Sequence, residues 1–265
     1  MQLETLNLTE QEWFDLYIDH ALGKRSDVIP FPGENLQCLT NSKKGLDTAK
    51  GAIEIWRTIK EGAESVKPID REWKVLDYGC GWGRMTRLLP FYFEPKNIFG
   101  VDVVEEFVQS ANQLMPSIVH KTIKSMQPIP FQAESFDLIF ANSVFSHLSE
   151  KSARYTVEEL VRILKPGGVI VLSVLEQPEL EKFYKTEEQK KWITGILGNL
   201  DDAVERLNTG SGFIWGDTKR WDNYGITVMR SEWMENLYHE NGLLYKGSFR
   251  SALPGSQNYK VGLKR

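Results

Sequence analysis

Cysteine is scarce in this chain, and its scarcity excludes several kinds of site. Two cysteines, Cys38 and Cys80, occur among 265 residues, and they form no CxxC pair. A disulfide framework and a cysteine-based zinc site are therefore excluded, and a reducing, cytoplasmic compartment is the default expectation. The four histidines show no ligand spacing with one another, so we expect no metal site.

Long apolar runs and an excess of positive charge are also missing. No apolar stretch approaches the ~20 residues that a membrane-spanning helix needs, and the first residues lack the basic and apolar regions of a signal peptide. We therefore expect no membrane association. Lys and Arg together number 32 against 36 Asp and Glu, which gives a formal charge of -4, so no nucleic-acid partner is expected.

The sequence that remains alternates short apolar runs with amphipathic stretches, which predicts parallel strands joined by crossover helices. The predicted strands are 74–78, 98–102, 136–141 and 169–174, and the predicted helices between them are 83–91, 104–115 and 151–164. A helix at 231–241 and two strands at 243–250 and 258–263 follow. The short link at 254–256 predicts that these last two strands form an antiparallel hairpin.

Two helices precede the first strand, and a different kind of segment interrupts the later part. The first helix spans about 9–22, with Thr9 and Glu12 as a capping box, and the second spans about 47–66, with a loop at 30–35 between them. We interpret 1–70 as an N-terminal helical cap and 71–265 as the main domain. An insertion is predicted at about 176–224, with a charged helix at 179–191 and a Gly- and aromatic-rich stretch after it.

A glycine loop follows the first predicted strand of the main domain. Gly79, Gly81 and Gly83 alternate with Cys80 and Trp82 behind the acidic Asp77. Alternate glycines let the backbone turn sharply and let a ligand approach the main chain. Arg84 occupies the position of the third glycine in a dinucleotide-binding GxGxxG pattern, and no GK[ST] follows, so a pyrophosphate site and a Walker loop are both disfavoured.

Asp102 ends the next predicted strand. In an open parallel sheet the ligand lies at the carboxyl ends of the strands, so Asp102 would lie beside the glycine loop and accept both hydroxyls of a ribose. That arrangement predicts a nucleoside site with no required phosphate. The alternative is that Asp102 only caps the helix that starts at Val104.

In these features the sequence resembles the class I S-adenosylmethionine-dependent methyltransferases. The matching motifs occur in the family's order within residues 74–175, and they are residues 77–83, 100–102, 128–139 and 164–168. The resemblance implies an α/β, Rossmann-like fold with a seven-stranded, mostly parallel sheet in the order 3-2-1-4-5-7-6. Helices on both faces and helical cap segments are expected with it.

The resemblance also implies a cofactor, S-adenosylmethionine, with S-adenosylhomocysteine as its product. The residues expected to bind it come from the loop, from the end of the second strand, from the segment before the fourth strand that borders the adenine, and from the end of the fourth strand. They are Asp77, Gly79, Cys80, Gly81, Gly83, Asp102, Val103, Ser125, Met126, Gln127 and Asn142. Cys80 can also be interpreted as a small, tightly packed side chain.

The segment after the fourth strand bears on the methyl acceptor. Residues 142–145 read Asn-Ser-Val-Phe and lack the [DNS]PP[YFW] signature of enzymes that methylate amino groups of adenine or glutamine. Together with Trp82, residues 143–148 resemble small-molecule methyltransferases, often of saccharide or polyketide tailoring. We therefore expect methyl transfer to a small-molecule hydroxyl, with His147 as the candidate base. His147 can equally be a packing residue at the start of the following helix.

Several other functions stay open on the sequence. N-methylation of a small molecule and methylation of a protein or an RNA would use the same core. A non-catalytic S-adenosylmethionine-binding protein would keep the loop and Asp102 as well. A nicotinamide-dependent oxidoreductase is disfavoured by Arg84.

Overall fold

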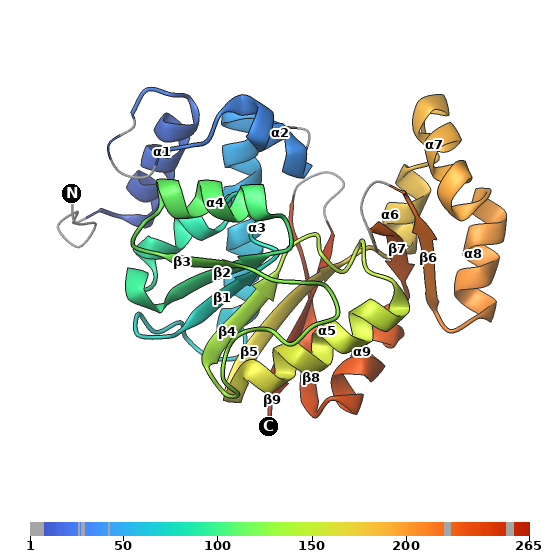
Figure 1. Cartoon of the computed structure of the whole chain (residues 1–265). Helices are drawn as coiled ribbons and strands as arrows, with labels where there is room; N and C mark the ends of the chain where they lie inside the picture. Colours follow the sequence, from blue (N-terminus) through green and yellow to red (C-terminus); the bar gives the residue numbers. More distant parts are fainter. Residues whose placement is uncertain (1–7, 26, 28–29, 42, 220–223, 253–256) are drawn as a thin grey trace.

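The centre of the molecule is a seven-stranded sheet (Figure 1). The structure, a computed structural model, describes residues 8–25, 27, 30–41, 43–219, 224–252 and 257–265. In spatial order the strands are β3 (Val119–Thr122), β2 (Ile98–Asp102), β1 (Val75–Tyr78), β4 (Phe136–Ala141), β5 (Leu164–Val174), β9 (Asn258–Lys264) and β8 (Leu243–Arg250). The first five are parallel, and β9 is antiparallel to both of its neighbours. The predicted fold and strand order are confirmed, because β8 and β9 are the sixth and seventh strands of this sheet.

Alternate side chains of the strands enter two cores, one on each face of the sheet. Val75 of β1 belongs to the core beneath α1 (Glu10–Ala21), α3 (Gly45–Glu64) and α4 (Glu105–Leu114). Its neighbour Leu76 belongs to the core beneath α5 (Glu150–Ile163) and α9 (Ser231–Glu240). Helices therefore cover both faces, as predicted.

The N-terminal helices share a core with the sheet. Thr9 caps α1 and forms the predicted capping box with Glu12. On α3, Trp56 is fully buried, and its ring centroid lies 5.8 Å from that of Phe140 on β4. The described part of residues 1–70 thus packs on one face of the sheet, and its treatment as a separate cap stays a prediction.

Four short elements differ from the sequence prediction. A helix, α2 (Glu34–Asn41), starts within the predicted loop. The helix predicted at 83–91 is a series of turns followed by a 3-10 helix, η2 (Thr86–Phe91), since Pro90 inside it has no N–H to donate. A second 3-10 turn, η3 (Pro95–Asn97), precedes β2. No residues were predicted for β3, which is a short and partly exposed edge strand.

Residues 177–229, which we call the α6–β7 segment, project beside the sheet (Figure 1). Its elements are α6 (Gln177–Lys182), α7 (Glu187–Leu197), α8 (Leu200–Thr209), β6 (Phe213–Asp217) and β7 (Gly225–Met229). The two strands form a separate antiparallel pair. The single helix predicted at 179–191 is wrong, because Thr186 caps a new helix there by accepting the N–H of Gln189.

The α6–β7 segment is joined to the main sheet at the carboxyl end of β4. The backbone N–H groups of Gly225 and Thr227 donate to the carbonyl oxygens of His147 (2.9 Å) and Ser146 (2.8 Å). An insertion with bounds of about 176–224 stays a prediction. The antiparallel pairing of β8 with β9 is confirmed, while the predicted link at 254–256 lies outside the described residues.

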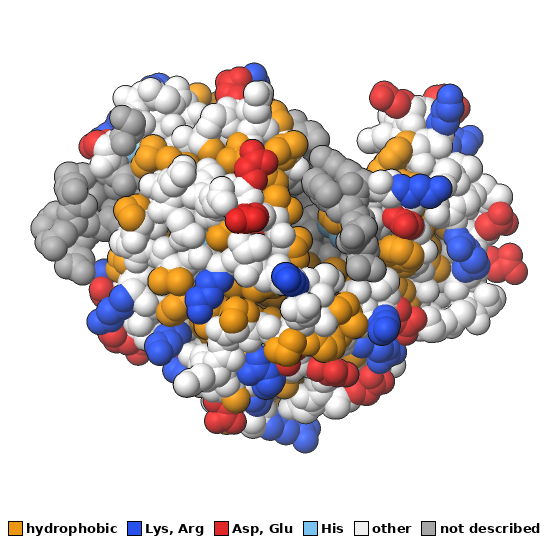
Figure 2. Space-filling model, viewed as in Figure 1, with side chains coloured by type: hydrophobic (Ala, Val, Ile, Leu, Met, Phe, Trp, Pro, Cys, Tyr) orange, Lys and Arg blue, Asp and Glu red, His pale blue; other side chains and the backbone are white. Residues whose placement is uncertain are grey.

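Within the described residues, no helix is both long enough and apolar enough to cross a membrane. On the face drawn in Figure 2, lysine and arginine are interspersed with aspartate and glutamate. That face carries no continuous basic stripe of the kind that tracks a nucleic-acid backbone.

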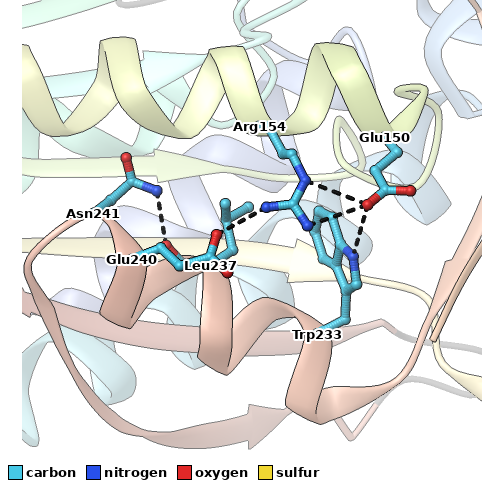
Figure 3. A network of polar contacts seen from close by, with 6 residues as sticks. All are labelled: Glu150, Arg154, Trp233, Leu237, Glu240 and Asn241. Atoms are coloured by element: carbon cyan, nitrogen blue, oxygen red, sulfur yellow. Dashed lines mark hydrogen bonds and ion pairs between the residues drawn. The ribbon is translucent and has the colours of Figure 1, made fainter. Parts of the chain in front are cut away.

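Helices α5 and α9 are joined by a polar network above their shared core (Figure 3). Arg154 of α5 donates to Glu240 of α9 at 2.8 Å and also to Glu150, and its guanidinium lies 5.1 Å from the ring centroid of Trp233. The indole N–H of Trp233 donates to the same Glu150 oxygen at 3.3 Å. The network fixes how α9 lies against α5 on this face.

Candidate functional site

The glycine loop between β1 and η2 has a backbone that other residues would strain. Gly79, Gly81 and Gly83 have φ angles of 77°, 55° and 81°, in the left-handed region that favours glycine. A Cβ at Gly79 would lie 2.3 Å from Val144 Cγ2, and one at Gly83 would lie 2.2 Å from Met115 Cε. Conformation and close packing therefore both require glycine here.

Four N–H groups of this loop are used inside the protein. Those of Gly79 and Cys80 both donate to the carbonyl of Val101, at 2.8 and 3.0 Å. The N–H of Gly81 donates to Asp102 Oδ2 at 2.8 Å, and that of Gly83 donates to the carbonyl of Cys80 at 2.9 Å. A phosphate-binding loop directs such N–H groups at its ligand. These four N–H groups are therefore not directed at a phosphate.

Asp102 lies at the carboxyl end of β2, next to the loop. Its carboxylate accepts the N–H of Gly81 and, through Oδ1, the N–H of Val104 at 2.9 Å. Asp102 thus lies beside the loop as predicted, whereas α4 has no side-chain cap hydrogen bond, so the helix-capping alternative is not met. A carboxylate offers about four lone-pair sites, so acceptor capacity remains for ribose hydroxyls. Burial raises the pKa of Asp102, and the two N–H donors oppose that shift.

Val103 and the segment predicted to border the adenine follow the neighbouring strands β2 and β3. Val103 is 56% exposed, which is unusual for a valine and suits contact with an apolar ring face. Ser125, Met126 and Gln127 form a turn after β3, with Met126 at φ 58°. The backbone of that segment is held by a bond from the Ile123 N–H to the Asp102 carbonyl at 2.9 Å.

Two buried groups lie beneath the loop. Asp77 is 1% exposed and accepts the Thr86 hydroxyl at 2.6 Å, and burial raises the pKa of its carboxyl to about 7. Cys80 is 5% exposed, and burial raises the pKa of its thiol well above the usual value. Such a thiol stays protonated and unreactive, which favours the packing interpretation, while the contact of Cys80 with the cofactor stays a prediction.

Asn142 follows the end of β4 and belongs to a polar cluster that the sequence analysis did not find. Asn142 Oδ1 accepts the hydroxyl of Tyr259 at 2.6 Å. Gln257 Nε2 donates to the hydroxyls of Ser143 (2.9 Å) and Ser146 (3.2 Å), and its Oε1 accepts the Ser173 hydroxyl at 2.7 Å. The predicted hairpin next to β5 was the available signal, since it places residues 257–259 at the same sheet edge as Asn142.

His147 lies between this cluster and the α6–β7 segment. Its Nδ1 is 2.8 Å from the carbonyl of Gly225, which can only accept, so Nδ1 carries the proton. Nε2 is therefore the basic atom, and the Tyr224 hydroxyl lies 3.1 Å from it in donor position. The two rings stack with centroids 4.2 Å apart. The packing alternative is met, and the role of His147 as a base stays a prediction.

Comparison with known proteins identifies the core of the chain. Residues 76–172 match the family model described as a methyltransferase domain. Solved structures with the same fold include an S-adenosylmethionine-dependent methyltransferase from Mesorhizobium loti, at TM-score 0.53 and 12% identity, with 80% of this chain and 98% of that chain covered. Residues 76–172 of this chain are a methyltransferase domain. The predicted family is confirmed.

Curated relatives of this chain match over part of their length. Trans-aconitate 2-methyltransferase of Azoarcus sp. (strain BH72) is 34% identical over 109 residues, which cover 40% of this chain and 41% of that protein. Malonyl-[acyl-carrier protein] O-methyltransferase of Salmonella typhimurium (strain LT2) is 30% identical over 167 residues, covering 61% and 59%. The chain thus spans about half the length of the curated relatives it matches.

The cofactor that this family implies is S-adenosylmethionine, and the site residues fit it. The N–H groups of Gly79, Cys80, Gly81 and Gly83 are bonded within the protein, and S-adenosylmethionine carries no phosphate that would need them. Asp102 retains acceptor capacity for ribose hydroxyls.

Proposed function

We propose that this protein transfers the methyl group of S-adenosylmethionine to an oxygen of a small-molecule acceptor in the cytoplasm. The observation that carries the cofactor part is the glycine loop beside Asp102, whose carboxylate accepts the N–H of Gly81 at 2.8 Å. A nicotinamide dinucleotide is disfavoured by Arg84, which occupies the position of the third glycine in the dinucleotide-binding pattern.

Support for an oxygen acceptor comes from the end of β4 and from the relatives. The hydroxyl and amide groups of Asn142, Ser143, Ser146 and Gln257 form a polar surface there. Two relatives are named for acceptors that carry a carboxylate, trans-aconitate and a malonyl thioester. The [DNS]PP[YFW] signature of some amino-group enzymes is absent at residues 142–145.

The bound cofactor would supply an electrophilic methyl group for in-line displacement, and positioning of the acceptor would provide much of the acceleration. The residues after β4 would orient the acceptor. For a hydroxyl acceptor, His147 Nε2 would receive the proton after the Tyr224 hydroxyl has moved from it. A carboxylate acceptor arrives already deprotonated and needs no such base.

Calorimetric titration with S-adenosylhomocysteine tests the cofactor part. Wild type is expected to bind in the micromolar range and not to bind NADH. Asp102→Ala is expected to weaken binding ~10- to 100-fold, because it removes charge-assisted hydrogen bonds worth about 1 to 3 kcal/mol. The variant Asp102→Asn shows whether the loop still folds without the charge. Glu106 is an exposed carboxylate on the next helix, and Glu106→Ala should bind S-adenosylhomocysteine as wild type does. Binding of NADH in place of the homocysteine product would contradict the proposal.

Mass spectrometry of the methylated products tests the acceptor part of the proposal. The panel of acceptors contains hydroxyl, carboxylate and amine compounds, peptides and RNA. Methylation of small oxygen acceptors alone is expected, and methylation of amines, peptides or RNA in their place would refute it. Cofactor binding without any methylated product would identify a non-catalytic binding protein. His147→Ala is expected to lower turnover of hydroxyl acceptors far more than cofactor affinity.

A further inference from the structure

Arg84, the residue directly after Gly83, has its backbone fixed by the N-terminal helix. The hydroxyl of Tyr17 on α1 donates to the Arg84 carbonyl at 2.8 Å. Tyr17 itself is 5% exposed, so this contact is anchored in the core. The start of the Arg84 side chain is therefore held at the edge of the glycine loop.

The Arg84 side chain is half-buried, and it forms no hydrogen bond or ion pair with any residue in the described part of the chain. Other buried cations at this end of the sheet are paired. Arg87 donates to the carbonyl of Trp82 at 2.5 Å and stacks on that ring, and Lys260 lies 2.7 Å from Glu176 Oε1. A guanidinium has five N–H donors, and removing them from water without a partner is unfavourable.

Arg84 lies near Asp77 of β1 and Tyr259 of β9. Burial raises the pKa of both groups, and the nearby charge of Arg84 partly opposes each shift. Tyr259 in turn donates to Asn142 after β4. Asp77 forms no ion pair with Arg84, because it is turned to the Thr86 hydroxyl in the core.

We propose that Arg84 binds a carboxylate of a molecule in this site. The inference rests on the proposed function, since both ligands of a methyltransferase of this kind can bring that group: the cofactor through its methionine carboxylate, and the acceptor through a carboxylate of its own. The planar guanidinium matches a carboxylate with two parallel hydrogen bonds. The N–H groups of Gly79, Cys80, Gly81 and Gly83 are already used, so Arg84 is the charged donor next to the loop that a carboxylate can meet.

Calorimetry with Arg84→Met separates the two sources. Methionine preserves much of the packing without charge, and Arg84→Lys should retain part of the binding. The first probe pair is S-adenosylhomocysteine and its decarboxylated analogue S-adenosyl-3-thiopropylamine. If Arg84 binds the cofactor carboxylate, wild type prefers S-adenosylhomocysteine by ~10- to 100-fold, and Arg84→Met loses that preference.

The second probe is trans-aconitate, added to protein saturated with S-adenosylhomocysteine. If Arg84 binds the acceptor carboxylate, Arg84→Met binds S-adenosylhomocysteine as wild type does but binds trans-aconitate at least ~10-fold more weakly. Arg57→Met, on the exposed side of α3, serves as the matched control, and a cooperative melt of Arg84→Met shows that it is folded.

Two results overturn the inference in different ways. If Arg84→Met is folded and binds every probe as wild type does, Arg84 is no carboxylate ligand, and the proposed function stands. If wild type binds no S-adenosylhomocysteine, the proposed function fails, and the role of Arg84 fails with it.

Discussion

His120 on β3 combines deep burial with unsatisfied ring nitrogens. Its backbone is clamped by the Asn112 side chain, which accepts the His120 N–H and donates to its carbonyl, each at 3.1 Å. The ring is 4% exposed, and neither ring nitrogen has a partner within the described residues. Burial, assisted by the charge of Arg87, lowers the pKa of His120 to about 4. The native state therefore holds this imidazole neutral.

This residue predicts a loss of stability in mild acid. The unfolded chain protonates His120 near pH ~6.5, whereas the native state does so only near pH 4. The neutral imidazole therefore contributes fully to the free energy of unfolding at pH values above its pKa in the unfolded chain. That contribution is lost as the pH falls toward its pKa in the native state, and the loss is about 2 kcal/mol at pH ~5. Urea unfolding at about pH 7.5 and about pH 5 measures the decrease in the free energy of unfolding between the two pH values. In His120→Leu this decrease should be smaller by about 2 kcal/mol.

The exposed His239 provides the comparison, because His239→Leu should keep the wild-type difference between the two pH values. An unchanged pH dependence in His120→Leu would mean that the native state accepts the proton, and the burial argument would then be wrong.

The positions of some site residues depend on the nearby sequence, and the positions of others depend on contacts with distant parts of the chain. Gly79, Gly81 and Gly83 could be predicted because each meets a backbone requirement set within a few residues. Asp102 could be predicted from the rule that parallel strands end at one edge. Contacts such as that of Gln257 with Ser143 depend on side chains 114 residues apart, and no sequence spacing contains that geometry.

At the scale of elements, the periodicity of apolar residues predicted the helices that pack on the sheet, but it did not predict the bounds of the helices in the α6–β7 segment. The helix at 47–66 was predicted because its apolar face covers the sheet, and α3 differs from it by two residues at each end. The helices of the α6–β7 segment pack mainly on one another and on β6 and β7. The caps that divide them, such as Thr186 and Asn199, became visible only in the structure.

The closeness of α3 to the sheet depends on one glycine. A Cβ at Gly62 would lie 2.9 Å from Val261 Cγ2 on β9 and 3.4 Å from a ring carbon of Phe249 on β8. Val261 is fully buried and has no room to move. At Gly51 of the same helix, a Cβ would meet nothing within 4 Å.

The two glycines predict opposite effects of one substitution. Gly51→Ala should raise the free energy of unfolding by up to about 1 kcal/mol, because alanine is the better helix former. Gly62→Ala should lower it by about 1 to 3 kcal/mol, because overpacking outweighs the same gain. Urea unfolding of both variants measures the difference. Stabilisation by Gly62→Ala would show that α3 can move away from β9 at little cost.

In the whole molecule, the α6–β7 segment has its own core. Leu180, Ile193, Leu207 and Val228 are fully buried together, apart from the two cores of the main sheet. Polar contacts tie the segment to that sheet: Glu176, just before α6, pairs with Lys260 at 2.7 Å, and Glu179 pairs with Arg250. The backbone bonds of β7 to His147 and Ser146 also belong to this junction. A small core with a polar junction predicts local opening below the global free energy of unfolding.

Hydrogen exchange can separate the two units, using two fully buried leucines as matched sites. Leu207→Ala removes packing in the α6–β7 segment alone and should speed exchange there by an amount equivalent to about 2 to 5 kcal/mol, with β1 and β4 unchanged. Leu138→Ala, in the core beneath α3, should speed exchange in the sheet and, through global unfolding, in the segment as well. Equal acceleration of both regions by Leu207→Ala would mean that the molecule opens only as one unit. In that case Tyr224 and Gly225 would leave His147 only on global unfolding, and an acceptor would have to enter with that contact in place.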